Sequence, residues 1–128
     1  MAELLGDEMP LFLQIKRKIE DMIVNGSLKA GEQIPSTTQM VKFYQVNHLT
    51  VLKGINMLVD EGIVYKKRGV GMFVGDSARR ILRDRRQGHL VDDYIRPLLR
   101  EAEQLGIPSE KLISMVKHTA EEEGYDER

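Results

Sequence analysis

The sequence contains no cysteine and no tryptophan, and only 3 of its 128 residues are phenylalanine and 4 are tyrosine. Without cysteine the chain cannot form disulfide bonds, thiolate metal sites or a cysteine nucleophile. It also lacks an apolar run long enough to span a membrane, and its acidic start, MAELLGDEMP, is unlike a signal peptide. We therefore expect a cytoplasmic protein with no membrane partner.

The charges of the chain are unevenly distributed, although its formal net charge is only −1. Residues 66–86 hold eight cations and two acids, whereas the last ten residues hold five acids and one arginine. A chain of 128 residues has room for one domain, or for one small domain with an appendage. The basic band is the part suited to a polyanion such as nucleic acid.

Two helices are predicted in the first third of the chain. After Pro10, apolar side chains recur at spacings of three and four, which indicates an amphipathic helix that should end near Asn25-Gly26. Ser36 and Gln39 then form the pattern of a capping box, which predicts the start of a short second helix.

A third helix should begin after Asn47, a favourable N-cap, and end at Gly62. Its inward positions are Val51, Ile55 and Leu58. Two short helices joined by a three-residue turn are typical of a helix-turn-helix, although the same corner occurs in many helical proteins.

The loop KKRGVG lies between two short apolar runs, residues 63–65 and 72–74, which predict a β-hairpin. A glycine loop that cradles a nucleotide needs a helix after it, whereas here a strand follows. We therefore favour a wing whose cations meet a nucleic-acid backbone or minor groove, with a solvated charged turn as the alternative. The expected fold is mainly α with a small β-hairpin, a winged helix-turn-helix.

One set of motifs runs through residues 10–74: Pro10-Leu11 with Gln14-Ile15, Gly26-x-Leu28-x-x-Gly31, Ile34-Pro35-Ser36, Thr50-Val51, Glu61-Gly62 and Gly69-x-Gly71-x-Phe73-Val74. In combination they resemble the DNA-binding domain of the GntR family of bacterial transcription regulators. The resemblance implies a winged helix that binds an inverted-repeat DNA operator as a homodimer, most often as a repressor.

Only 54 residues follow Val74, and they resemble the short helical extension of the YtrA subfamily, which serves dimerisation. Their apolar positions predict two amphipathic helices. The first should be weakened at Gly88 and kinked at Pro97, and the second should begin with Ser109 as its N-cap. Folding back onto the winged helix is the alternative to burial against a partner chain. The residues expected to dimerise are Val91, Tyr94, Ile95, Leu98, Leu99, Ala102, Leu105, Leu112, Ile113 and Val116.

The resemblance also assigns roles in DNA binding. The residues expected to contact DNA are Ser36, Thr37, Thr38, His48, Leu49, Thr50, Leu52, Lys53, Lys67, Arg68 and Gly69. The family's usual Pro-Ser-Glu-Arg lead-in is replaced by Pro-Ser-Thr-Thr, and His48 and Leu52 occupy positions where arginines commonly read guanine. Because leucine can only touch a thymine methyl group, we expect a preference for sites that contain A·T pairs.

A second arginine-rich feature follows the wing, with Arg79, Arg83 and Arg86 on one helical stripe. This stripe is expected either to follow DNA phosphates or to form a solvated, salt-bridged linker. The expected organisation is a tail at residues 1–9, a winged helix-turn-helix at residues 10–76 and an α-helical dimerisation region with an acidic tail at residues 77–128.

Other functional classes receive little support from the sequence. The three histidines are far apart and lack carboxylates at ligand spacing, so we expect no metal and no cofactor, and no catalytic constellation is recognisable. A small-molecule effector, if there is one, should bind at the dimer interface or between the two parts. The main alternative to DNA binding is a winged helix used as a protein-interaction module, in which Leu49 and Leu52 pack on another protein.

Overall fold

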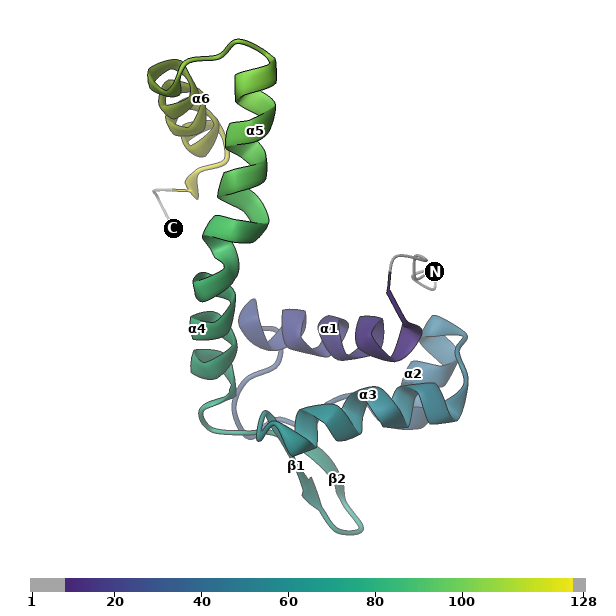
Figure 1. Ribbon diagram of the computed structural model, residues 1–128. Helices are drawn as coiled ribbons and strands as arrows, with labels where there is room; N and C mark the ends of the chain where they lie inside the picture. Colours follow the sequence, from purple (N-terminus) through teal and green to yellow (C-terminus); the bar gives the residue numbers. More distant parts are fainter. Residues whose placement is uncertain (1–8, 126–128) are drawn as a thin grey trace. The chain divides into compact units, whose positions relative to one another are not determined.

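The computed structural model describes residues 9–125 and divides into two compact units, which meet between Arg85 and Arg86. The first unit contains α1 (Leu11–Val24), α2 (Thr37–Tyr44), α3 (His48–Asp60), β1 (Val64–Lys67), β2 (Gly71–Val74) and the start of α4 (Ala78–Leu90) (Figure 1). The second contains the end of α4, a π-helical segment η1 (Val91–Ile95), α5 (Arg96–Gln104) and α6 (Ser109–Glu122). The predicted fold class is confirmed, while most of the predicted tail at residues 1–9 lies outside the described residues.

The core of the first unit forms where α1 packs against α3. The isoleucines of α1 at positions 15, 19 and 23 are fully buried, as the spacing of three and four predicts. From α3 the predicted inward residues Val51, Ile55 and Leu58 are all buried against them. Ile34, Met40, the hairpin and the first turns of α4 complete the core.

The helix-turn-helix owes its boundaries to local capping contacts that the sequence predicts. The Ser36 hydroxyl accepts a hydrogen bond from the backbone N–H of Gln39, and the Gln39 side chain accepts one from the backbone N–H of Ser36, which completes the capping box. The side chain of Asn47 accepts a hydrogen bond of 2.7 Å from the backbone N–H of Leu49. Between the two helices, Gln45 adopts the left-handed conformation (φ 56°), which makes the turn sharp.

The wing is an antiparallel hairpin whose register pairs Val64 with Val74 and Lys67 with Gly71. It projects from the helical part of the first unit, beyond the C-terminal end of α3 (Figure 1). At its tip the backbone N–H of Val70 donates to the carbonyl of Lys67, and Gly69 has a φ of 76°. A positive φ at the third position is the geometry of a type II turn, which favours glycine there.

The second unit departs from regular α-helix where Pro97 was expected to cause a kink. The residues immediately before it, Val91–Ile95, form a π-helical segment between α4 and α5. Since proline has no N–H to donate, the preceding turn must rearrange its hydrogen bonds. The expectation that Ser109 caps the last helix is wrong: Ser109 is the first residue of α6, Pro108 occupies the N-cap, and no side chain caps it.

No helix in the described part of the chain combines the length and the apolar character needed to cross a membrane.

The contact between α1 and α3 generates a prediction about Gly54. A Cβ at Gly54 would lie 2.7 Å from the carbonyl oxygen of Phe12 and 3.3 Å from Cγ2 of Ile15. We expect Gly54→Ala to force the two helices apart and lower the free energy of unfolding by about 1–3 kcal/mol, measured by urea denaturation. The matched control is Gly88→Ala in α4, where a Cβ meets nothing within 4 Å. Because alanine favours helix, this control should be neutral or stabilising, and equal destabilisation of both variants would contradict the packing argument.

Candidate nucleic-acid interface

The N-terminus of α2 and the wing together line a cleft of about 350 Å³. Ser36 and Thr37 contribute from the start of α2, and Lys66, Lys67 and Gly69 contribute from the hairpin. The first-turn N–H groups of a helix and a pair of lysines are both suited to an anionic group such as a phosphate. The cleft therefore brings four of the predicted site residues together, and it adds Lys66.

The predicted residues of α3 lie on its first two turns. Leu49 is 71% exposed, which is unusual for a leucine, and His48 is also exposed. Thr50 and Leu52, which were expected to contact DNA, are half-buried rather than fully exposed. Leu49 is thus an apolar side chain on a face of α3 that also exposes His48 and Lys53.

Lys53 is exposed, and its side chain lies against α1. Its ammonium group lies 3.9 Å from the centre of the Phe12 ring, which is within the range of a cation–π contact. No pattern in the sequence indicates this contact, since the two residues are far apart along the chain. The contact fixes one cation next to the exposed face of α3.

A similar contact orients Lys67 on the wing. The rings of Tyr65 and Phe73 are stacked with their centres 5.9 Å apart, and the ammonium group of Lys67 lies 4.6 Å from the centre of Phe73. Arg68 and Gly69 occupy the turn beyond this pair. The aromatic residues therefore stiffen the base of the basic tip.

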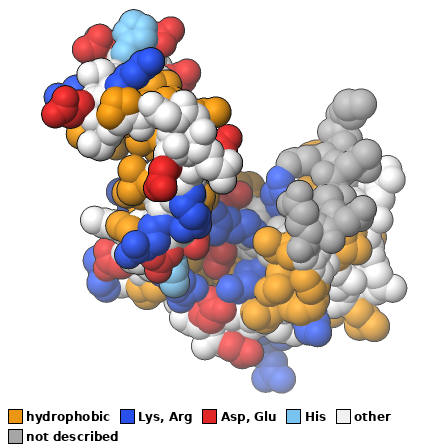
Figure 2. All heavy atoms as spheres, turned by 45° about the horizontal axis from the view of Figure 1, so that its top comes forward, with side chains coloured by type: hydrophobic (Ala, Val, Ile, Leu, Met, Phe, Trp, Pro, Cys, Tyr) orange, Lys and Arg blue, Asp and Glu red, His pale blue; other side chains and the backbone are white. Residues whose placement is uncertain are grey.

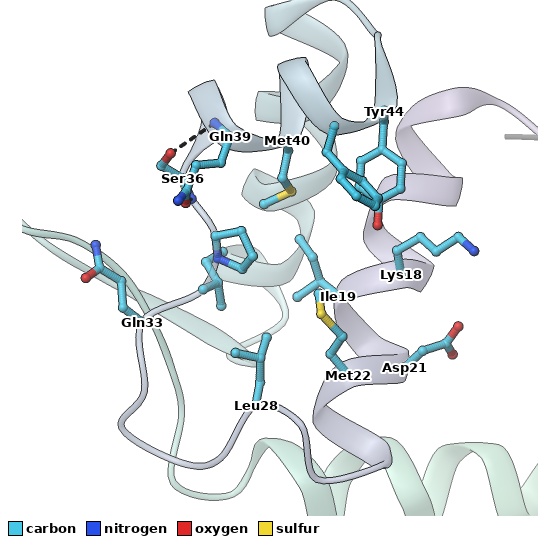
Figure 3. Close-up of a pocket in the computed structure, with 13 residues that line it drawn as sticks. Lys18, Ile19, Asp21, Met22, Leu28, Gln33, Ser36, Gln39, Met40 and Tyr44 are labelled. Atoms are coloured by element: carbon cyan, nitrogen blue, oxygen red, sulfur yellow. Dashed lines mark hydrogen bonds between the residues drawn. The ribbon is translucent and has the colours of Figure 1, made fainter. Parts of the chain in front are cut away.

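A second and larger groove, of about 1080 Å³, lies between α1 and α2 (Figure 3). Its floor includes the buried side chains of Ile19 and Met40, and polar groups such as Lys18 lie at its rim. Ser36 and Gln39 border it too, and their capping contact is drawn at its upper edge (Figure 3). The start of α2 thus lies between this groove and the cleft beside the wing.

Two of the arginines that follow the wing bind within the first unit. The Nε of Arg79 donates a hydrogen bond of 3.2 Å to the carbonyl oxygen of Val24, at the end of α1. Arg85 pairs with Glu61 at 3.0 Å and lies 3.9 Å from Glu20. These contacts favour a structural role for both side chains over the role in phosphate binding that the sequence also allowed.

Glu61 lies at the centre of a four-residue ion cluster that joins α1, the end of α3 and α4. Lys16 is 2.9 Å from Glu61 and 3.4 Å from Glu20, and Glu20 is nearly buried. Burial by itself would raise the pKa of Glu61, but hydrogen bonds and charge attraction from Lys16 and Arg85 outweigh it. The net effect holds the pKa of Glu61 below its ordinary value of 4.5.

The second unit leaves many large apolar side chains at its surface. Hydrophobic side chains are visible among charged ones over this unit (Figure 2). Eight of the ten residues expected to dimerise are exposed: Val91, Tyr94, Ile95, Leu98, Leu99, Leu105, Ile113 and Val116. The other two, Ala102 and Leu112, are 5% and 8% exposed and are already buried within the chain. The exposed set also includes Leu90, Met115 and Tyr125, which the sequence analysis did not select.

No group of three or more histidine, aspartate or glutamate side chains within residues 9–125 is arranged to hold a metal ion.

The arrangement of three helices, a basic hairpin and an exposed helix face is that of a winged helix-turn-helix protein. The chain matches the family of bacterial regulatory proteins called the gntR family over residues 11–74, half of its length. It therefore belongs to the GntR family, as its motifs predicted.

Similarity extends beyond the winged helix in two of the related proteins. The HTH-type transcriptional repressor YtrA of Bacillus subtilis is 26% identical over 84% of this chain and 82% of its own length. A GntR family regulator from Listeria monocytogenes is 28% identical, with a TM-score of 0.73 over 89% of this chain and 98% of that one. The predicted likeness to the YtrA subfamily is confirmed.

Two further relatives match mainly the first unit. The arabinose metabolism transcriptional repressor of Geobacillus stearothermophilus is 32% identical over 68% of this chain, which spans only 24% of that protein. The DNA-binding domain of AraR, solved in complex with operator ORX1, matches 58% of this chain and 96% of its own with a TM-score of 0.56 and 28% identity.

The ion cluster generates a prediction about pH. Because the folded-state pKa of Glu61 is lowered, its contribution to stability is present above about pH 4.5 and is lost as the pH falls through the folded-state pKa. We expect Glu61→Gln to be less stable than the wild type at pH 7, and the difference to shrink as the pH is lowered towards 3. Urea denaturation at several pH values measures this difference. Asp60→Gln is the control. A difference in stability between Glu61→Gln and the wild type that grows at low pH would contradict the lowered pKa of Glu61.

Proposed function

We propose that the protein is a transcription regulator that binds an operator in double-stranded DNA, and that it acts as a homodimeric repressor. The observation that carries the proposal is the cleft in which the start of α2 faces the lysines of the wing. A duplex backbone laid across this cleft would place phosphates within reach of Ser36, Thr37 and the two lysines. The operator complex of the similar AraR domain supports the same class of partner.

In this proposal α3 enters the major groove and reads the sequence. Thr50 and Lys53 contact phosphates, Thr38 adds a donor at the start of α2, and His48, Leu49 and Leu52 face the base edges. Leucine has no hydrogen-bonding group, so its favourable contact with a base edge is apolar and directed at a thymine methyl group. We infer operators in which A·T pairs lie opposite the first turn of α3.

The wing supplies a second contact through Arg68 and Gly69, which reach the adjacent minor groove. Arginine is favoured where the minor groove is narrow, since the electrostatic potential there is most negative. Glycine at the turn allows the backbone to approach the duplex closely. An A·T-rich operator would therefore suit both α3 and the wing.

The second unit is proposed to pair two copies of the chain. Burying a leucine or isoleucine is worth about 1.5–3 kcal/mol, so the exposed apolar side chains of this unit together favour association strongly. The resulting dimer would present two winged helices to an inverted repeat. In this proposal residues 10–76 bind DNA and residues 77–128 dimerise. The protein works in the bacterial cytoplasm. A small-molecule effector would bind at the interface between the copies.

The alternative function is a protein-interaction module, which the high exposure of Leu49 favours. A hydrophobic protein contact would not depend on the charges of the wing. Removal of those charges therefore separates the two functions.

We predict that the double substitution Lys67→Gln/Arg68→Gln weakens binding to the labelled promoter of the protein's own gene at least about 10-fold, because it removes two cations, Lys67 at a phosphate and Arg68 at the minor groove. The slope of log K against log salt should fall by about two. Arg17→Gln/Lys29→Gln removes the same charge from α1 and the following loop and should leave both quantities unchanged. Equal losses in the two variants, or equal affinity for scrambled DNA, would contradict specific binding through the wing.

We also predict that Leu99→Glu/Ile113→Glu converts a dimer into a monomer in sedimentation velocity experiments, because two charges would be placed in an apolar interface. Operator affinity should fall in parallel, since one winged helix then binds without the other. Gln87→Glu/Gln104→Glu makes the same charge change at exposed polar positions and should remain dimeric. A wild-type protein that stays monomeric at high concentration would exclude the proposed assembly.

A further inference from the structure

The segment before α2 pairs with β2 through an isolated antiparallel bridge. The backbone N–H of Gly31 donates to the carbonyl of Val74, the N–H of Val74 donates to the carbonyl of Glu32, and the N–H of Ile34 donates to the carbonyl of Met72, each at 2.9 Å. Gln33 faces Phe73 in this antiparallel bridge. β2 is therefore held on both sides, by β1 and by residues 31–34.

The side chain of Gln33 extends this support to the tip of the wing. Its amide nitrogen, Nε2, donates a hydrogen bond of 3.1 Å to the carbonyl oxygen of Val70. Val70 closes the turn that carries Arg68 and Gly69, through its own N–H bond to Lys67. Gln33 lies at the edge of the groove with its amide directed away from Ile19 (Figure 3).

Gly71 leaves the space that this hydrogen bond requires. Gly71 has a φ of 146°, and a Cβ added there would overlap the Nε2 of Gln33. The nearest atoms that such a Cβ would meet all belong to the Gln33 side chain. The absence of a side chain at Gly71 therefore leaves room for the amide of Gln33.

We propose that Gln33 is a positioning residue for DNA recognition: its amide holds the turn of the wing so that Arg68 and Gly69 are presented in one fixed geometry. Beyond Met72 the hairpin is paired only as two strands, an arrangement that is marginally stable in water, so a tip without this support would sample several conformations. Binding would then have to order the tip, and the cost of that ordering would be subtracted from the affinity. The inference rests on the proposed contact between the wing and DNA.

A double-mutant cycle tests the proposal on the full-length protein. The variants are Gln33→Met, which keeps the length of the side chain and removes the donor, Arg68→Ala, and the two combined. Binding to the labelled promoter of the protein's own gene is measured by fluorescence anisotropy, with thermal melting as the control for folding. Gln87→Met, an exposed glutamine of α4, is the matched control.

Gln33→Met should weaken binding about 3- to 10-fold, the range expected for one lost hydrogen bond. In the Arg68→Ala background it should have little further effect, because the contact that it positions is already gone. Losses that add in full would show that Gln33 acts independently of Arg68, and an unchanged affinity in Gln33→Met would show that the tip needs no support. Either result overturns the proposal.

The outcome for Arg68→Ala alone distinguishes the two levels of inference. If Arg68→Ala binds like the wild type, Arg68 makes no contact with DNA that Gln33 could position, and the proposed role of Gln33 fails together with that part of the proposed function. If Arg68→Ala weakens binding while Gln33→Met does not, only the positioning role fails. Both results are read from the same titrations.

Limited proteolysis provides a readout on the free protein. Trypsin cleaves after Lys66, Lys67 and Arg68, so the rate of cleavage at these sites reports how often the tip departs from its folded geometry. Gln33→Met should be cut faster there than the wild type or Gln87→Met, with a similar melting temperature. Gly71→Ala, which displaces the same amide from the opposite side, should also be cut faster. Equal cleavage rates in the variants and the wild type would contradict the positioning role of Gln33.

Discussion

The packing of the isoleucine face of α1 against α3 is the interaction on which the candidate interface depends. These isoleucines are fully buried, and Gly54 lets the backbone of the two helices approach closely. Because protein interiors are densely packed, a shift of α1 would be transmitted to α2 and the hairpin, which share the same core. The positions of the cleft, the exposed turn of α3 and the wing are therefore set by one small core.

Individual cations of this nearly neutral chain have distinct roles. Arg79 and Arg85 stabilise the first unit from within, through the end of α1 and through Glu61. Lys53 and Lys67 are held against aromatic rings, which costs less conformational entropy on binding than a freely moving lysine would. In the proposed complex with DNA, positioned cations and the proposed pairing of two copies would compensate for the lack of arginine in α3.

The sequence predicted most of the features that depend on neighbouring residues, with the cap at Ser109 as the exception. The capping box at Ser36, the N-cap at Asn47 and the hairpin turn are all encoded within a few positions, and each is present. The contact of Gln33 with Val70 and that of Lys53 with Phe12 join distant positions, and no periodicity marks them. The π-helical segment was anticipated only as a kink, because Pro97 indicates a lost hydrogen bond without indicating how the chain accommodates it.

The exposed Leu49 at the start of α3 has a consequence for what the proposed regulator can distinguish. A side chain that recognises a base through its methyl group would respond to that group wherever it is displayed in the major groove. 5-Methylcytosine displays a methyl group at the same ring position as thymine. Covalent modification of cytosine could therefore alter operator occupancy without any change in the genetic sequence, and replacement of thymine by uracil would remove the apolar contact altogether.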